Sequence, residues 1–317
     1  MIIHPCPITS LFEQNEVYWN INIKCFDDVK KNQQFSNVLV NKIYNFNYFT
    51  EFKTLNLFEY HSSVNLIILK ANLDYIQPLL ENFEMKQKLL SLSLSDNLKI
   101  FKMATIFRTI YNRLFKFKPE LERKFENFKR KAKPNEQTKL FCAQVRIGGQ
   151  SSYVYDDRIF ASRNSSKLFW NFKRNKIIKN ELNYKLFITS DTESVANEAI
   201  EEFGEDRVRI IEGLYKHLDR SPNNSTSCKL YEKTILDMHA FQLCDKAVIS
   251  RGGYGLMGNF LREDPFEEFY RYTEIIKEES SIKSVEVKFI KIENFNDLEE
   301  NWKSRRIAFE LKINISS

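Results

Sequence analysis

The sequence predicts an α/β fold whose sheet is mostly parallel. Between residues 139 and 266, short apolar runs typical of buried strands alternate with amphipathic helical segments. Such alternation favours parallel strands joined by right-handed helical crossovers. Glycines or small polar residues follow three of these strands, and parallel sheets bind their ligands beyond the carboxyl ends of strands. The central region is therefore predicted to be a ligand-binding α/β domain.

The predicted elements of this domain follow one another with few residues between them. The strands are expected at 140–145, 184–188, 207–211 and 246–249, and the helices at 167–178, 191–203, 231–244 and 256–261. With 317 residues, 43% of them hydrophobic, the chain can form one large domain or two ordinary ones with a sizeable core.

The flanking regions are predicted to differ from the central domain. Residues 1–134 are expected to form a separate N-terminal domain. Its expected strands are 17–23, 38–44 and 64–69, and its expected helices 72–90, 98–114 and 120–131. A polar, proline-containing linker at 131–136 places the boundary at 134, so the central domain is 135–265. The C-terminal extension, 266–317, is predicted to contain a helix, a strand at 285–292, a helix near 298–302 and a strand at 307–313.

Composition excludes several classes of protein. The net charge of +6 suits an anionic ligand such as a nucleotide, but it is too small and too evenly spread to indicate a nucleic-acid partner. No segment has the roughly 18 consecutive apolar residues of a membrane span, and the start lacks the features of a signal peptide. The histidines and cysteines form no metal-ligand spacing, so no metal site is expected. Cys142 and Cys244 are predicted to be buried free thiols, whereas Cys6 could bridge Cys25 in a secreted protein.

The first candidate site is the end of the strand 140–145. Arg146 follows this strand, and Gly148 and Gly149 come shortly after. A guanidinium group offers a planar fork of donors that matches phosphate oxygens, and glycines let the backbone approach a ligand closely. The sequence therefore predicts a diphosphate site at Arg146. An exposed strand end with a surface arginine is an equally good local interpretation.

Two later strand ends carry similar features. Ser190 and Asp191 begin a helix after the strand 184–188, which is typical of an anion site but, on local sequence, more typical of helix capping. Ser250, Gly252, Gly253 and Tyr254 follow the strand 246–249, in the layout of a phosphate-binding turn or of an ordinary tight turn. Asp237, on the preceding helix, could accept the two adjacent donors on the edge of guanine. His217 with Asp219 could form a polar contact at the rim, although a surface histidine is the favoured interpretation.

Taken in order, these motifs resemble the superfamily of GDP-fucose-dependent fucosyltransferases that includes the α-1,2, the α-1,6 and the protein O-fucosyltransferases. Gln144-Val145-Arg146 lies where these enzymes have an H-x-R motif, and Ser190-Asp191 lies at their T/S-D turn. Asp237 to Asp245 matches a D-x-x-x-L-x-x-C/A-D helix, with Phe241 at the leucine position, and it leads into the loop Ser250 to Gly255. The resemblance covers 140–261.

The resemblance implies a two-domain GT-B fold with a Rossmann-type donor domain, and inverting transfer of fucose from GDP-fucose to a glycan or protein hydroxyl. Residues 1–134 would be the acceptor-side domain, which looks short for a full acceptor domain. It implies no cofactor and no metal, and a place in the Golgi or ER lumen; if the absent leader is genuine, the chain is cytoplasmic. Arg146 would be catalytic, holding the diphosphate and assisting its departure, and Asp237 would recognise guanine. The residues predicted to bind the donor are Gln144, Gly148, Ser190, Asp191, Asp237, Ser250, Gly252, Gly253 and Tyr254.

The sequence also departs from that family. Gln144 replaces the usual histidine, and glycines replace the hydroxyl residues of the third loop, where backbone amides could take over their contacts. The candidates for a general base are Asp156, Asp157 and Glu193. The departures motivate an alternative, a catalytically impaired pseudoenzyme that binds a nucleotide or glycan in the same cleft. A third interpretation is an unrelated α/β protein whose loops imitate the pattern.

Overall fold

The computed structural model describes residues 6–17, 38–43, 54, 66–71, 81–84, 86–87, 103–147, 166–215, 226–250, 253–279, 282–294 and 297. The chain divides into two compact units, Gln14–Phe115 on the one hand and Met1–Glu13 with Lys116–Ser317 on the other. The division near 115 differs from the expected boundary at 134. Helix α7 (Pro119–Ala132) accounts for the difference, because it packs on β6 and α10 of the central sheet unit.

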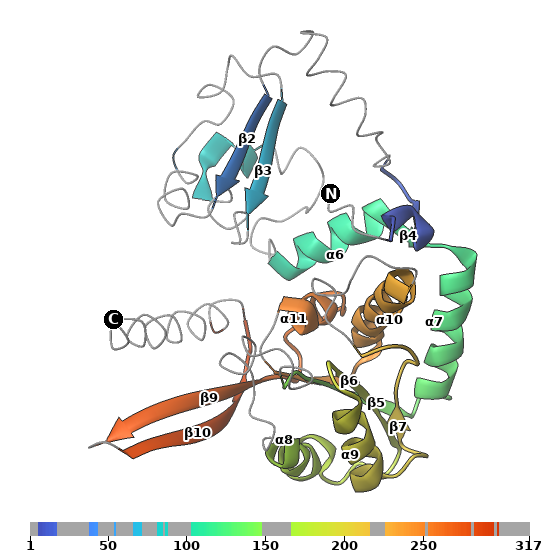
Figure 1. Ribbon diagram of the computed structural model, residues 1–317, viewed down its shortest axis with the longest axis vertical. Helices are drawn as coiled ribbons and strands as arrows, with labels where there is room; N and C mark the ends of the chain where they lie inside the picture. The colour runs from blue at the N-terminus through green and yellow to red at the C-terminus, as the bar shows by residue number, and fades with distance from the viewer. Residues whose placement is uncertain are drawn as a thin grey trace. The chain divides into compact units, whose positions relative to one another are not determined.

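The larger unit is built on a six-stranded sheet within the described residues (Figure 1). Its strand order is β10-β9-β8-β5-β6-β7. The strands are β5 (Lys139–Val145), β6 (Tyr184–Ser190), β7 (Val208–Arg209), β8 (Lys246–Ile249), β9 (Phe269–Glu279) and β10 (Ile282–Lys291). All neighbouring pairs are parallel except β9 and β10. The α/β class and the mostly parallel sheet are confirmed.

Helices cover both faces of this sheet (Figure 1). On one face lie α8 (Ser166–Phe172), its π-helical continuation η4 (Lys173–Ile178) and α9 (Glu193–Phe203). On the other lie α10 (Thr226–Ala240), the short 3-10 turn η6 (Phe241–Leu243) and α11 (Gly253–Phe260). The helices predicted from 167, 191, 231 and 256 are thus present, with bounds that shift by a few residues.

Alternation along the strands decides which side chains meet which helices. Phe141, Val145 and Ile188 belong to the core shared with Phe169 of α8. Phe187 points the other way, where its ring meets Phe128 of α7 at a centroid distance of 5.3 Å and Phe241 at 5.9 Å. By the same alternation, even-numbered β5 residues and odd-numbered β6 residues face α10 and α11. Every β5 residue after Lys139 is buried, which makes this strand the centre of the core.

Helix α7 shows why its sequence folds as predicted. Pro119 stands at the first helical position, Glu120 and Glu122 follow in the first turn, and three basic residues occupy the last turn. Its buried residues are Leu121, Phe125, Phe128 and Ala132, which recur at helical spacing along one face.

The smaller unit contains a parallel pair, β2 (Val38–Ile43) with β3 (Leu66–Ala71), and helix α6 (Met103–Leu114). These elements match strands expected at 38–44 and 64–69 and part of the helix expected at 98–114. Two short strands, β1 (Phe12–Gln14) and β4 (Phe115–Phe117), pair with one another after the 3-10 turn η1 (Ile8–Ser10). Most of the helix expected at 72–90 and of the strand expected at 17–23 lies outside the described residues.

The C-terminal extension was predicted wrongly in its first element. A helix was expected shortly after 266, but 269–279 is strand β9, which pairs in parallel with β8 and antiparallel with β10. The aromatic and β-branched residues that begin this segment suit a strand, and the sheet offers β8 as a partner. The strand expected at 285–292 is confirmed within β10. The helix near 298–302 and the strand at 307–313 lie outside the described residues.

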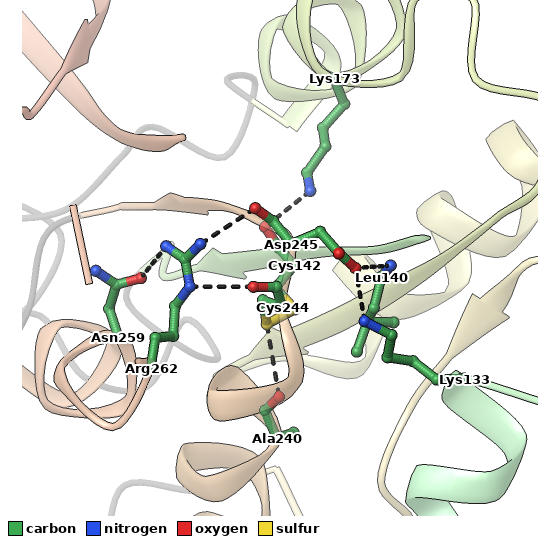
Figure 2. Close-up of a disulfide and its surroundings, with 9 residues drawn as sticks. All are labelled: Lys133, Leu140, Cys142, Lys173, Ala240, Cys244, Asp245, Asn259 and Arg262. Carbon is green, nitrogen blue, oxygen red and sulfur yellow. Dashed lines mark hydrogen bonds and ion pairs between the residues drawn. A yellow bond between two sulfur atoms is a disulfide. The ribbon is translucent and has the colours of Figure 1, made fainter. Parts of the chain in front are cut away.

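Cys142 and Cys244 are buried, as predicted, but the prediction that their thiols are free was wrong. Cys142 on β5 forms a disulfide with Cys244, which precedes β8 (Figure 2). Cys6 forms a disulfide with Cys228 on α10. Strand alternation turns Cys142 toward the α10 face, where its Cα lies 5.8 Å from that of Cys244, within the range that a disulfide spans. Cys25, the partner expected for Cys6, lies outside the described residues.

Two absences hold for the described part of the chain. None of its helices has both the length and the apolar character needed to cross a bilayer. In the same residues, histidine, cysteine and acidic side chains form no group able to hold a metal ion.

Candidate functional site

The predicted site residues converge at one edge of the sheet. Because β5, β6 and β8 run parallel, their carboxyl ends lie side by side, and the register pairs Val145 with Ser190 and Gln144 with Ile249. The next residues along each strand are therefore neighbours as well. The strand order places all three inside the sheet, away from its two edge strands. The structure brings Arg146, Asp191 and Ser250 together.

A chain of hydrogen bonds fixes the start of the Arg146 loop. The Arg146 backbone N–H donates to Ser250 Oγ at 2.8 Å, and Ser250 Oγ donates to Gln144 Oε1 at 3.2 Å. The Ser250 N–H also donates to the Gln144 carbonyl at 2.8 Å. Ser250 and Gln144 are 0% and 4% exposed, so these bonds replace water entirely. Both residues hold the loop that carries Arg146, and their predicted contact with the donor stays a prediction.

Gly255 makes room for this arrangement. A Cβ atom added at Gly255 would lie 2.9 Å from Gln144 Oε1 and 3.2 Å from its Cδ, closer than such contacts normally come. Any larger residue would press on the amide that anchors Ser250. The glycine is therefore needed for the close packing of α11 over β5, rather than for contact with a ligand.

Asp191 holds the other side of the Arg146 loop. Its Oδ1 accepts a hydrogen bond from the Ile147 N–H at 3.1 Å, and its Oδ2 lies 3.9 Å from Arg146 Nε. The carboxylate thus orients the guanidinium group while the Arg146 side chain stays 23% exposed. Ser190 Oγ accepts from the Thr192 N–H at 3.2 Å, which stabilises the turn just before α9. This edge can present a fixed, solvent-accessible positive charge to an anion.

Asp237 lies on α10 and contacts Thr189 near the end of β6. Its Oδ2 accepts hydrogen bonds from Thr189 Oγ1 at 2.9 Å and from Lys233 Nζ at 2.8 Å. Its Oδ1 is buried and makes no hydrogen bond within the part of the chain that the structure describes. Burial raises the pKa of the Asp237 carboxyl, and the Lys233 charge opposes that rise. Thr189 links this carboxylate to the β6 end, so Asp237 belongs to the same site.

Lys233 and Tyr215 are site residues that the sequence prediction missed. The Lys233 Nζ lies 5.0 Å from the centroid of the Tyr215 ring. Burial raises the pKa of the Tyr215 hydroxyl to about 12, helped by the charges of Asp237 and Glu193. Gly213, with φ of 147°, packs on the Lys233 stem so closely that an added Cβ would lie 2.9 Å from it. The four-residue spacing of Lys233 and Asp237 on one helix was the signal available in the sequence.

The third loop is only partly described. The Tyr254 hydroxyl donates to the Thr234 carbonyl at 2.8 Å and thereby fastens the start of α11 to α10. Burial raises the pKa of Tyr254 well above its ordinary value. Gly253 is exposed, and nothing lies within 4 Å of an added Cβ there, so the start of α11 faces open space. Gly148, Gly252 and His217, and the general-base candidates Asp156 and Asp157, lie outside the described residues.

A cavity of about 360 Å³ lies at the opposite, amino edge of the sheet. Lys139 and Lys246, the first residues of β5 and β8, help to line it, together with Asp245, Arg262 and Glu268. Asp245 already accepts from Lys133 and from the Leu140 N–H (Figure 2). Because its charges pair with one another, we assign no ligand to this cavity.

The hydrogen-bond chain predicts the effect of Ser250→Ala. Loss of the hydroxyl leaves Gln144 Oε1 and the Arg146 N–H without this partner, which is expected to cost about 2–3 kcal/mol of unfolding free energy. We also expect weaker binding of a diphosphate, because the Arg146 loop loses an anchor. Urea unfolding and calorimetry measure the two effects. Asn197→Ala, which removes an exposed amide on α9, is the control and is expected to change stability by less than about 0.5 kcal/mol.

Three solved structures superpose on this chain to different extents. Arabidopsis thaliana FUT1, in a mutant form in complex with GDP, superposes with a TM-score of 0.54 at 13% identity, over 84% of this chain and 61% of that chain. NodZ α-1,6-fucosyltransferase soaked with GDP-fucose gives a TM-score of 0.37 at 12% identity, over 69% of this chain and 70% of that chain. NodZ from Bradyrhizobium gives 0.34 at 12% identity, over 59% and 50%.

The first of these comparisons shows a shared fold. The chain has a fucosyltransferase-like α/β fold, as its motifs predicted, and it spans 61% of the length of the plant protein. No protein-family model and no curated protein matches the sequence.

Proposed function

We propose that the chain is a glycosyltransferase that transfers fucose from GDP-fucose to a hydroxyl of a glycan or glycoprotein. The observation that carries the proposal is the convergence of three parallel strand ends on Arg146, which Asp191 and Ser250 orient while its side chain stays 23% exposed. The fold shared with a protein solved in complex with GDP supports it.

The proposed chemistry follows from the charge that develops at the leaving group. When the bond between fucose and GDP breaks, negative charge gathers on the diphosphate, and a preoriented cation stabilises the transition state more than the ground state. Arg146 is the residue assigned to this role. Backbone amides at the start of α11, next to the exposed Gly253, would add donors at a helix N-terminus. Transfer is proposed to invert the anomeric centre and to need no metal or cofactor, as the family resemblance implies.

The proposal also covers recognition of guanine, the roles of the two units and the cellular compartment. Asp237 Oδ1, buried and without a hydrogen bond in the described residues, would accept an N–H from guanine. The GT-B arrangement, with the smaller unit contacting the acceptor, stays part of the proposal. The Cys6–Cys228 and Cys142–Cys244 disulfides support an oxidising compartment such as the ER or Golgi lumen, because disulfides persist there.

A second candidate function is a nucleotide-binding protein of the same fold without transferase activity. The Lys233–Asp237 ion pair favours it, because the carboxylate proposed to recognise guanine already has an internal partner. Gln144, which replaces the usual histidine, is likewise occupied by Ser250 and packed against Gly255. This candidate binds GDP but does not turn GDP-fucose over.

One experiment separates the two. The purified chain is titrated with GDP by calorimetry and then incubated with GDP-fucose and a panel of glycan and glycoprotein acceptors, while release of GDP is followed. Acceptor-dependent release of GDP supports the transferase, and GDP binding without release supports the second candidate. If saturating GDP neither binds nor raises the melting temperature, both are wrong, since a ligand of the native state must stabilise it.

A further inference from the structure

We propose that Lys233 is a specificity-determining residue, and that Lys233 and Asp237 together read the C=O and N–H groups at the six-membered edge of a purine base. The inference rests on the proposed function, because it assumes that a nucleoside diphosphate binds with its diphosphate at Arg146. It goes further by naming which atoms of the base are read and which are not.

The first step concerns the two oxygens of Asp237. Oδ2 accepts from Thr189 Oγ1 at 2.9 Å and from Lys233 Nζ at 2.8 Å, and a carboxylate oxygen has two lone pairs. That oxygen is therefore saturated by the protein. Oδ1 is buried and makes no hydrogen bond among the described residues. A base can be read by Oδ1 alone, so the usual clamp of both oxygens on two adjacent donors is not available.

The second step concerns the donors of Lys233. An ammonium group carries three N–H donors, and in the described residues Asp237 Oδ2 takes one of them. The Nζ also lies 5.0 Å from the centroid of the Tyr215 ring. An ammonium donor thus stands beside a carboxylate acceptor, and the two side chains are only 4% and 5% exposed.

The third step matches this pair to a base. Guanine and hypoxanthine both present O6, an acceptor, beside N1–H, a donor, and this order suits Lys233 beside Asp237 Oδ1. Adenine presents the reverse order, an amino donor at C6 beside the N1 acceptor. With the diphosphate fixed at Arg146, adenine would place its amino group against the ammonium and its N1 lone pair against the carboxylate. The 2-amino group, which only guanine has, finds no second carboxylate oxygen.

The packing of the Lys233 methylenes limits which residue can replace Lys233. Gly213 leaves no room above the Lys233 methylenes, where an added Cβ would lie 2.9 Å away. Methionine keeps an unbranched apolar stem of similar length in this space and removes the charge. Lys233→Met therefore tests the ammonium group rather than the packing. Lys229→Met, which removes an exposed ammonium group from the preceding turn of α10, is the matched control.

The test compares three diphosphates of equal charge, GDP, IDP and ADP, by calorimetry on the wild-type chain. We expect IDP to bind within about threefold of GDP, and ADP to bind at least about 10-fold more weakly, as one mismatched donor–acceptor pair costs. In Lys233→Met the affinity for GDP and IDP is expected to fall about 10-fold or more, with that for ADP unchanged. Lys229→Met is expected to keep the wild-type ratio of GDP to ADP affinity.

The outcomes separate this inference from the proposed function. If GDP binds and IDP binds 10-fold or more weakly, both carboxylate oxygens read the base and the inference is overturned. The inference is also overturned if GDP and ADP bind with equal affinity, or if folded Lys233→Met binds GDP as the wild type does. In both cases the proposed diphosphate site is not contradicted. If none of the three binds, the proposed function fails as well. The wild-type comparison decides the matter even if Lys233→Met does not fold.

Discussion

Replacing Arg146 by alanine is expected to lower kcat/KM for transfer from GDP-fucose by about 10²–10³-fold, while the protein stays folded. The expected loss is large because Arg146 is the cation assigned to the departing diphosphate, and charge stabilisation at a leaving group counts mainly in the transition state. Binding of GDP is expected to weaken less than transfer does, since the product gains only part of that stabilisation.

The fold is expected to survive because the side chain of Arg146 is not what anchors the loop. The anchors are the Arg146 N–H, which donates to Ser250 Oγ, and the Ile147 N–H, which donates to Asp191 Oδ1. Both are backbone groups that alanine retains. With 23% of its side chain exposed, Arg146 leaves no large cavity when it is shortened.

Two variants control this measurement. Arg146→Lys keeps the charge but loses the planar fork of donors, and it is expected to retain activity between that of alanine and that of the wild type. Arg130→Ala removes an exposed arginine from the last turn of α7, away from the sheet edge, and is expected to leave activity unchanged. Full transferase activity in Arg146→Ala would show that the diphosphate site lies elsewhere.

The parallel sheet could be predicted from the sequence because its signals are local. Buried runs such as 140–145 and 184–188 show strand character by themselves, and the helices between them have one apolar face. Because such strands run parallel, Arg146, Asp191 and Ser250 could be predicted to lie at one edge of the sheet. The register of β5 with β6 and β8 places them there.

The parts that could not be predicted depend on contacts between distant residues. Strand β9 is a strand because β8 and β10 offer it partners on both sides, and a local pattern does not contain them. The Cys142–Cys244 pair requires the α10 face of β5 to be known, over a separation of 102 residues. Ser250 and Gln144 form a hydrogen bond across 106 residues of sequence, a contact that no local pattern contains.

The disulfide between Cys142 and Cys244 gives the second large expected effect. The double variant Cys142→Ala/Cys244→Ala is expected to lose about 3–5 kcal/mol of unfolding free energy, because the bridge closes a loop of about 100 residues in the unfolded chain. Both sulfur atoms belong to buried residues, 0% and 6% exposed, so a small packing loss adds to the effect. Urea unfolding followed by circular dichroism measures it.

The geometry of the native state is expected to change little in this variant. The Cys142 carbonyl accepts a hydrogen bond from the buried Lys173 Nζ at 2.8 Å, and the Cys244 carbonyl accepts one from Arg262 Nε at 3.1 Å (Figure 2). These backbone anchors do not depend on the bridge. Below its lowered melting temperature, the variant should therefore bind GDP as the wild type does.

The other disulfide supplies the matched comparison. Cys6→Ala/Cys228→Ala removes a bridge between residues 222 apart in the sequence. Because this bridge closes a longer loop than Cys142–Cys244, chain entropy predicts a loss of unfolding free energy about 0.7 kcal/mol larger. If both double variants lose stability and keep GDP affinity, the bridges act through the unfolded state. A loss of GDP affinity in Cys142→Ala/Cys244→Ala alone would mean that the bridge itself shapes the Arg146 edge. Alkylation of Cys142 or Cys244 in the unreduced native protein, detected by mass spectrometry, would contradict the bridge altogether.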